Sequence, residues 1–359
     1  MKWLVIWPKD SSIPENRLKE VWEYVLRTAP QLNTPSVILH TTEELENHIK
    51  TPTALMGCRV LFVIALGSEG INLTLCSMLR IFRKFPGCLK DSAAGMIVDG
   101  NSELYTKAVA SELALTLSMS GCTLIGKCLV EGTGSLYNFQ VTAGNWNCDL
   151  ETAYRLCAAQ MAERLLSFQF PDTQTPRILC IHSSNRSTSN TLRLWELVKK
   201  GIRPEIPIKE ISLRNGEVRD CAGCSFETCM YYSRNLSCYY GGTIVEEVYP
   251  ALEWCDRLVL LCPNYNDALG ANLTAMINRL TSLFRKRPFY DKQLFALIVS
   301  GYSGSDLVAR QLIDSLSMNK AFTLPGNFAL SVTANLPGSL DRILDITERA
   351  KGFGEFLSR

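Results

Sequence analysis

Residues 177–199 read Arg-Ile-Leu-Cys-Ile-His-Ser-Ser-Asn-Arg-Ser-Thr-Ser-Asn-Thr-Leu-Arg-Leu-Trp-Glu-Leu-Val-Lys. The apolar run at the start predicts a strand buried on both faces, and the apolar spacing after Asn190 predicts a helix. Apolar runs and amphipathic segments alternate in the same way along most of the chain, which is typical of a parallel sheet covered by helices. We therefore predict an α/β fold of doubly wound, five-stranded parallel sheets in three layers.

Strands and helices are predicted in two series. The first has strands at Leu4–Trp7, Ser36–His40, Val60–Leu66 and Ala93–Val98, and helices at Glu15–Arg27, Thr42–Ile49, Leu73–Phe82 and Leu104–Ser118. The second has strands at Arg177–Ile181, Ile208–Leu213, Arg257–Cys262, Leu294–Val299 and Phe328–Val332, and helices at Asn190–Lys199, Val245–Glu253, Leu273–Phe284 and Asp306–Ser315. The tail, residues 341–359, is predicted to be helical.

A polar, proline-bounded stretch at residues 171–176 separates the two series and predicts a linker between a domain at 1–170 and a domain at 177–359. Short words recur across this break: Gly-Ile-Asn-Leu-Thr at 70–74 returns as Gly-Ala-Asn-Leu-Thr at 270–274. Three further words recur in the same order at nearly the same offset. Two unrelated α/β domains could share such words through composition alone, but the common order favours one unit used twice.

Composition excludes several classes of protein. The 359 residues carry a net charge of +2, which gives no basic field for nucleic acid, and three histidines give little material for a His-based metal site or a Ser/His/Asp triad. No apolar run is long enough to cross a membrane, and no secretory signal is evident, so we predict a cytoplasmic protein. The 14 cysteines are then reduced thiols, metal ligands or redox groups.

The loop after the first strand of the second half, residues 182–191, is rich in hydroxyl and amide side chains, contains one arginine and has no carboxylate. It leads into a helix N-terminus, where backbone N–H groups and the helix dipole favour an anion. We predict that this loop holds a phosphate dianion. The alternative is a polar turn that only caps the helix.

Two further loops follow neighbouring strands and lie at the same edge of the sheet, where α/β proteins bind ligands. Pro263-Asn264-Tyr265-Asn266 offers a stiff turn, an aromatic face and amide donors, which suit the edge of a planar heteroaromatic ring. The loop at 300–306 supplies two glycines for close backbone approach. The alternatives are an Asn-rich turn with a tyrosine packed on the rim, and a helix cap at Asp306.

The first half lacks these features. Its loop after the first strand, Pro8–Glu15, carries two carboxylates, which repel an anion, and two prolines, which remove N–H donors. The loop at 65–70 has neither a proline nor an aromatic residue. We predict that only the second half holds a cofactor.

On these motifs, residues 177–332 resemble the NADPH-dependent FMN reductase family of flavodoxin-like flavoproteins and their iron–sulfur flavoprotein relatives. Residues 183–191 follow the family's phosphate loop with Ser183 in a glycine position, residues 263–266 follow its flavin turn, and residues 273–279 approximate its next helix with Thr for Lys and Asn for Asp. The resemblance implies two tandem flavodoxin-like units, the first degenerate. It also implies FMN, with its phosphate at Ser184, Arg186, Ser189, Asn190 and Thr191, and its ring at Pro263, Asn264, Tyr265, Asn266, Ser300, Gly301, Tyr302 and Gly304.

Four cysteines, Cys221, Cys224, Cys229 and Cys238, follow the second strand of the second half. Four thiolates from one loop can hold a [4Fe–4S] cluster or Zn²⁺. The iron–sulfur relatives carry a more closely spaced cysteine quartet at this place. In this chain two of the three intervals between successive cysteines are longer than theirs. Free thiols in a structured loop are the alternative.

The leading hypothesis is an FMN-dependent oxidoreductase that takes a hydride from NAD(P)H and passes electrons to a small-molecule acceptor. The flavin carries the chemistry, so no catalytic side chain is required. The alternatives are an iron–sulfur electron carrier that serves protein partners, and a non-catalytic redox-sensing or scaffold protein. The resemblance implies a protein that often dimerises with the flavin near the interface. We therefore hypothesise that the two halves form an intrachain pseudo-dimer, with further oligomerisation left open. No nucleic-acid or membrane partner is expected.

Overall fold

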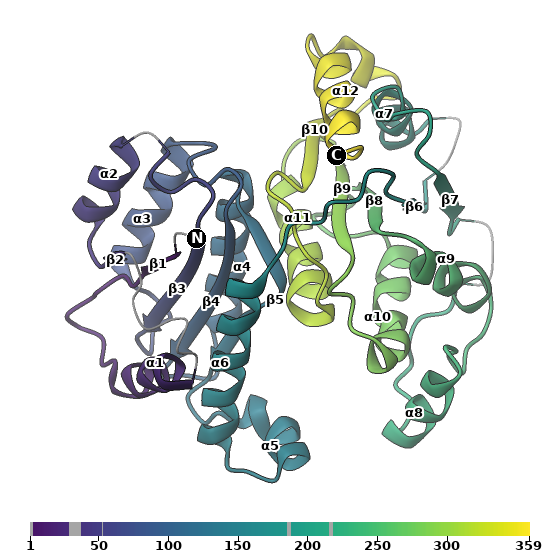
Figure 1. Cartoon of the computed structure of the whole chain (residues 1–359). Coiled ribbons are helices and arrows are strands. Elements are labelled where there is room, and N and C mark those ends of the chain that lie inside the picture. Colours follow the sequence, from purple (N-terminus) through teal and green to yellow (C-terminus); the bar gives the residue numbers. More distant parts are fainter. Residues whose placement is uncertain (1–2, 29–36, 52, 185–187, 215–217) are drawn as a thin grey trace. The chain divides into compact units, whose positions relative to one another are not determined.

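The computed structural model describes residues 3–28, 37–51, 53–184, 188–214 and 218–359. The chain forms two compact units (Figure 1). The first comprises residues 1–169 and 324–327, and the second comprises residues 170–323 and 328–359.

The first unit alternates strands with helices along the chain. Its strands are β1 (Trp3–Ile6), β2 (Val37–Leu39), β3 (Arg59–Leu66), β4 (Ala93–Gly100) and β5 (Thr123–Gly132). Its helices are α1 (Asn16–Thr28), α2 (Thr42–Lys50), α3 (Leu73–Lys84), α4 (Thr106–Met119), α5 (Gln140–Trp146) and α6 (Leu150–Ser167), with a 3-10 turn at Tyr137–Phe139. The five strands are parallel, in the order β2-β1-β3-β4-β5.

The second unit repeats this arrangement. Its strands are β6 (Ile178–His182), β7 (Ile208–Ser212), β8 (Arg257–Pro263), β9 (Gln293–Ser300) and β10 (Ala329–Thr333). Its helices are α7 (Asn190–Lys199), α8 (Phe226–Arg234), α9 (Tyr249–Trp254), α10 (Ala271–Lys286), α11 (Ser305–Leu312) and α12 (Ile346–Phe356). The parallel order β10-β9-β8-β6-β7, read from β7, equals that of the first unit.

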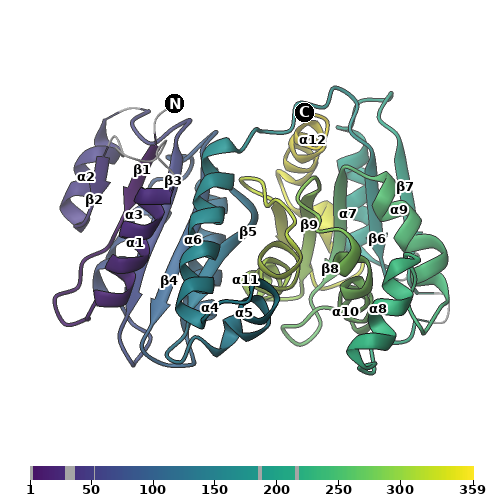
Figure 2. The same ribbon diagram turned by 60° about the horizontal axis from the view of Figure 1, so that its bottom comes forward.

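Each sheet is the middle layer between two layers of helices (Figure 2). In the first unit α1 packs beside α6, and in the second α7 packs beside α12. Every residue of β3, β4 and β8 is buried, whereas β7, at a sheet edge, is only partly buried. These layers confirm the predicted α/β architecture of two five-stranded parallel sheets.

Several elements differ from the sequence predictions. The expected helix at Val245–Glu253 is a π-helical turn, Ile244–Val248, followed by α9, and the expected helix at Asp306–Ser315 is α11 followed by a π turn, Ile313–Met318. Gly304 caps α11, and Asp306 lies in its first turn. In the tail, residues 346–356 form α12 after a 3-10 turn at Ser339–Arg342.

In each unit, a buried arginine at the start of the third strand donates hydrogen bonds to carbonyl oxygens at the C-terminal end of the last helix. In the first unit Arg59 donates to the carbonyl oxygen of Phe168, just after α6, at 2.6 Å. In the second, Arg257 donates to the carbonyl oxygens of Phe356, at 3.3 Å, and Leu357, at the end of α12. Burial lowers the pKa of Arg257 to about 10, so the guanidinium stays charged at neutral pH. Carbonyl oxygens left over at a helix end need such partners.

We expect Arg257→Met to destabilise the second unit by about 2 kcal/mol, because two helix-terminal carbonyl oxygens lose their donor while the site remains buried. The measurement is the urea midpoint of the second unit's unfolding transition. Arg234→Met, at an exposed position at the end of α8, is the matched control and should leave that midpoint nearly unchanged. Equal effects of the two substitutions would show that the buried hydrogen bonds contribute little.

A second interaction joins the first residues of the unit to β8. Asp256 accepts hydrogen bonds from the backbone N–H of Arg177 at 2.8 Å and from its guanidinium at 2.8 and 3.1 Å. Burial raises the pKa of Asp256, but the bonds from Arg177 outweigh burial and lower that pKa below its ordinary value.

A depressed carboxyl pKa stabilises the fold above the unfolded-state pKa of about 3.9, and this stabilisation is lost as the pH falls through the folded-state value. We therefore expect Asp256→Asn to cost about 1 kcal/mol at pH 7 and much less near pH 3. Urea unfolding of both proteins at the two pH values measures this. A difference that does not shrink on acidification would contradict the assignment.

Candidate functional site

The candidate site lies where the strands of the second unit end. Four loops meet at this edge, because the carboxyl ends of parallel strands point the same way. They follow β6, β8, β9 and β10. The described residues predicted to bind the cofactor lie in the first three of these loops or at the ends of the elements that flank them.

The loop after β6 contains a buried hydroxyl without a partner. Ser184 is 3% exposed, its backbone N–H donates to Nδ1 of His182 at 3.3 Å, and its Oγ has no hydrogen-bond partner among the described residues. Ser189 caps α7, because its Oγ accepts from the backbone N–H of Leu192 at 3.2 Å. The predicted ligand Arg186 lies outside the described residues.

Asn190 ties the start of α7 to the loop after β10. Its Nδ2 donates to the carbonyl oxygens of Ala334 at 3.0 Å and Leu336 at 2.8 Å, and its Oδ1 accepts from the backbone N–H of Gly338 at 3.1 Å. Its neighbour Thr191 is also buried. The Asn190 side chain therefore positions the loop after β10. Phosphate binding, the role predicted for this residue, is left to its backbone N–H.

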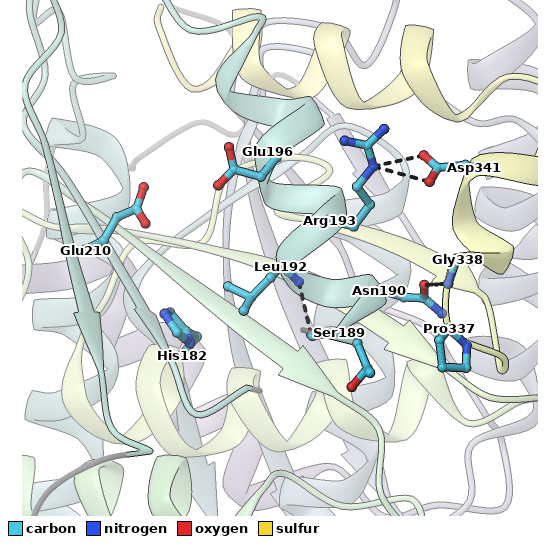
Figure 3. A pocket seen from close by; sticks show the side chains of 11 residues that line it. His182, Ser189, Asn190, Leu192, Arg193, Glu196, Glu210, Pro337, Gly338 and Asp341 are labelled. Carbon is cyan, nitrogen blue, oxygen red and sulfur yellow. Dashed lines mark hydrogen bonds and ion pairs between the residues drawn. The ribbon is translucent and has the colours of Figure 1, made fainter. Parts of the chain in front are cut away.

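A pocket of about 630 Å³ opens over the first turns of α7 (Figure 3). Of the predicted residues it includes Ser189 and Asn190. Sequence reasoning missed its other walls, His182 and Glu210 on one side and Pro337, Gly338 and Asp341 on the other. The position of residues 337–338 after the fifth strand was the available signal, since that loop lies at the same edge of the sheet.

The acidic groups around this pocket are paired with cations. Arg193 Nε bonds Asp341 at 2.9 Å, as the dashed lines in Figure 3 show, and Lys199 bonds both Glu196 at 2.8 Å and Glu210 at 2.9 Å. Burial raises the pKa of Glu210, but Lys199 and Trp195 outweigh burial and lower that pKa. Glu210 is therefore ionised and balanced by Lys199 at neutral pH.

The loop after β8 is a tight turn that Asn264 anchors to the loop after β9. Tyr265 and Ala268 face each other across the turn, and both residues between them, Asn266 and Asp267, have positive φ. Asn and Asp favour such two-residue hairpin turns. Asn264 Nδ2 donates to Ser300 Oγ at 3.1 Å and to the carbonyl oxygen of Ser303 at 2.9 Å, whereas its buried Oδ1 has no partner among the described residues.

The loop after β9 approaches the β8 turn closely at Gly304. A Cβ placed there would lie 1.9 Å from Asp267 Oδ1 and 3.0 Å from Asn264 Nδ2, and the φ of this residue is +80°. Tyr302 is 82% exposed, and its hydroxyl accepts a hydrogen bond from Asn335 Nδ2, in the loop after β10, at 2.7 Å. Side-chain amides thus connect the loops after β8, β9 and β10.

In the first unit the corresponding edge is filled by its own side chains. Asp10 accepts from the backbone N–H of Leu73, at the start of α3, at 3.1 Å and from Ser12 Oγ at 2.6 Å. Hydrogen bonds from Ser12 lower the pKa of Asp10, so it is a carboxylate at neutral pH. The buried Glu15 pairs with Lys9 and accepts from Trp7 Nε1 at 3.0 Å. Two carboxylates therefore stand where the second unit has neutral donors.

At the same edge, an ion pair links α1 to the ends of β4 and β5. Arg17, in α1, bonds both carboxylate oxygens of the buried Asp99, at 2.9 and 3.2 Å, and the carbonyl oxygens of Gly100 at 2.9 Å and Gly134 at 3.1 Å. Asn190 makes the corresponding tie in the second unit with a neutral amide.

The four predicted metal ligands are not arranged as a metal site. All four cysteines are described and free, with Cys221 exposed and the others half-buried. Among the described residues, no group of three or more His, Cys, Asp or Glu side chains is placed to hold a metal ion. The geometry therefore gives no support to a cluster or Zn²⁺ at this loop.

Comparisons with known proteins agree with the resemblance in the second half. Residues 176–335 match the sequence model of the NADPH-dependent FMN reductase family, which supports an NAD(P)H-dependent flavin oxidoreductase domain. No curated protein matches the chain. Among the described residues, no helix has the length and apolar character needed to cross a bilayer.

Two solved structures illustrate the structural likeness. NAD(P)H:quinone oxidoreductase from Methanothermobacter marburgensis has 13% identity and a TM-score of 0.43, covering 52% of this chain and 97% of that chain. An FMN-dependent NADH-azoreductase from Bacillus anthracis str. Ames Ancestor, in complex with FMN, has 11% identity and a TM-score of 0.34, covering 51% of this chain and 100% of that chain.

The crowding at Gly304 gives a testable prediction. Gly304 and Gly338 both have positive φ, but a Cβ at Gly338 would meet nothing within 4 Å. Gly338→Ala should therefore cost only backbone strain, about 1 kcal/mol, whereas Gly304→Ala adds a clash and should cost about 2–4 kcal/mol. Urea midpoints of both variants measure this, and equal costs would show that the two loops do not pack as described.

Proposed function

We propose that the second unit binds FMN and transfers a hydride from NAD(P)H to it, and then electrons to a small-molecule acceptor. The observation that carries this proposal is the unpartnered, buried hydroxyl of Ser184 in the loop that leads into α7. A buried polar group without a partner is costly unless a ligand satisfies it. The family match over residues 176–335 supports the same cofactor.

For the phosphate, the donor set fits a dianion. We assign Ser184 Oγ and the backbone N–H groups at the start of α7 to the phosphate oxygens, together with Ser189, Thr191 and Arg186. The helix dipole adds a favourable field at this point. The nearby carboxylates do not oppose the anion strongly, because Lys199 and Arg193 pair with them.

For the ring, we assign the loops at 263–266 and 300–304. Asn264 Oδ1 is an unpaired buried acceptor, which suits an N–H group on the edge of a heteroaromatic ring. Tyr265 and Tyr302 are 62% and 82% exposed and offer aromatic faces at the rim. Gly301 lets the backbone approach the ring from the side of β9.

FMN, when bound, supplies the hydride and electron chemistry. The chain binds the phosphate end at α7, and the hydrogen bonds of Asn264 and Asn335 hold the ring loops in fixed relative positions. We assign the backbone N–H groups at 266 and 301–304 to negative charge that develops on the ring. The backbone N–H groups of Asn264 and Tyr265 already donate to the carbonyl oxygens of Val299 and Ala268. No side-chain acid or base is required, in keeping with the few histidines of the chain.

In the first unit we propose that FMN does not bind. The carboxylate of Asp10 already accepts the N–H at the start of α3, and the buried Glu15 adds a second carboxylate to the same segment, residues 8–15. Removing such groups from their partners to admit another anion costs more than it returns. A single FMN per chain is the expected stoichiometry.

The test is a visible spectrum of the purified full-length chain and titration with FMN. The wild-type chain should bind one FMN, and Ser184→Ala should raise the Kd tenfold or more, because a hydrogen bond to a charged group contributes about 1.5–3 kcal/mol. The control is Ser11→Ala, in the loop after β1, which should leave the Kd unchanged.

Addition of NADH or NADPH under anaerobic conditions should then bleach the flavin absorbance of the bound complex. Absence of FMN binding would overturn the proposed cofactor. Binding without bleaching by either nucleotide would overturn the proposed reaction while leaving the cofactor in place. Two FMN per chain would contradict the account of the first unit.

A further inference from the structure

The four clustered cysteines lie in one loop, residues 219–241, that is closed at its neck by a single buried side chain. Arg279, in α10, is 1% exposed, and its guanidinium donates to the carbonyl oxygens of Arg219 at 3.3 Å and Gly241 at 2.7 Å. One planar group therefore holds both ends of this cysteine loop. The loop contains α8 and belongs to no part of the proposed FMN site.

Each arm of the loop is pinned to the same face of α10. Asn278 Nδ2 donates to Asp220 Oδ1 at 2.9 Å on the first arm, and Ser282 Oγ donates to the carbonyl oxygen of Ser237 on the second. Residues 278 and 282 are one helical turn apart, which separates their Cβ atoms by about 6 Å on one side of a helix. Cys221 and Cys238 directly follow the pinned residues.

We propose that Cys221 and Cys238 are a redox pair that forms a reversible disulfide across the neck of the cysteine loop. A disulfide needs Cα atoms within about 4.4–6.8 Å of each other, a spacing similar to that of the two anchoring points on α10. The free thiols of the present structure correspond to the reduced form.

The other two thiols are held differently. Cys224 lies 4.0 Å from the Tyr240 hydroxyl oxygen, with which its sulfur interacts, and Cys229 lies inside α8, where the helix fixes its backbone. Cys221 is the exposed member of the set. An exposed thiol is the one that a dissolved disulfide can reach, so Cys221 is the attacking residue.

The oxidant we specify is a low-molecular-weight disulfide such as glutathione disulfide. The Cys221 thiolate attacks one sulfur, forming a mixed disulfide and releasing one glutathione thiolate. The Cys238 thiolate then attacks the Cys221 sulfur, releasing the second glutathione and closing the protein disulfide. The chain loses two electrons and two protons, and one glutathione disulfide becomes two glutathione thiols.

The experiment uses the full chain in glutathione buffers from reducing to oxidising. Free thiols are alkylated after acid quenching, and tryptic peptides are examined by mass spectrometry. Cleavage after Arg219 and Arg234 places Cys221 and Cys238 on separate peptides, so their disulfide appears as a cross-linked pair. We expect Cys221 and Cys238 to become protected together as the buffer becomes oxidising.

Variants separate this pair from the other thiols. Cys221→Ser and Cys238→Ser should each abolish the cross-link, whereas Cys224→Ser, Cys229→Ser and the control Cys76→Ser, an exposed thiol on α3, should preserve it. Circular dichroism checks that each variant is folded. Independent alkylation of all four thiols in every buffer would overturn the proposal, as would a cross-link from Cys224 or Cys229 that survives Cys221→Ser. Stoichiometric iron or zinc in the isolated protein would also overturn it.

Discussion

Burial of both faces of a parallel sheet is the constraint on which the rest of this molecule depends. Parallel strands pair stably only when helices cover the sheet on each side, so β3, β4 and β8 are mostly apolar and are buried along their whole length. A ligand cannot reach a sheet face that is covered by helices. It is confined to the edge where the strands end, and the loops at that edge have to satisfy their own polar groups. The same constraint applies to both units, which share one strand order.

The two units differ in how they satisfy the polar groups at that edge. The first fills it with charged side chains: Asp10 accepts an N–H at the start of α3, and Arg17 pairs with Asp99. The second joins its loops through neutral amides, Asn190, Asn264 and Asn335, and leaves Ser184 Oγ and Asn264 Oδ1 without partners. Unpaired buried polar groups are costly in a free protein, and they concentrate at sites where a ligand supplies the missing partners. This contrast locates the proposed cofactor in one unit.

Buried arginines perform two different tasks in the structure. Arg257 joins the third strand of its unit to the last helix, as Arg59 does in the other, and these contacts complete the helical layer that covers the sheet. Arg279 instead closes the neck of the cysteine loop by bonding two backbone carbonyl oxygens. A guanidinium suits both tasks, because it presents several donors in a plane and needs no carboxylate partner when carbonyl oxygens surround it. The cysteines are positioned by this scaffold and show no metal-ligand geometry.

The local sequence was sufficient for most strands, for the helices with a clear apolar stripe and for the loops at the ends of the strands, since these follow from the order of apolar and polar residues. It was insufficient for α8, in which Ser233 alone is buried, and for α6, whose buried residues are largely alanines without a strong stripe. Only the tertiary structure decided that the Asn190 side chain holds the β10 loop, that Asn266 provides a left-handed turn, and that Asp10 caps a distant helix. Each of these roles depends on a partner far away in the chain or on a backbone conformation, and local residue order encodes neither directly.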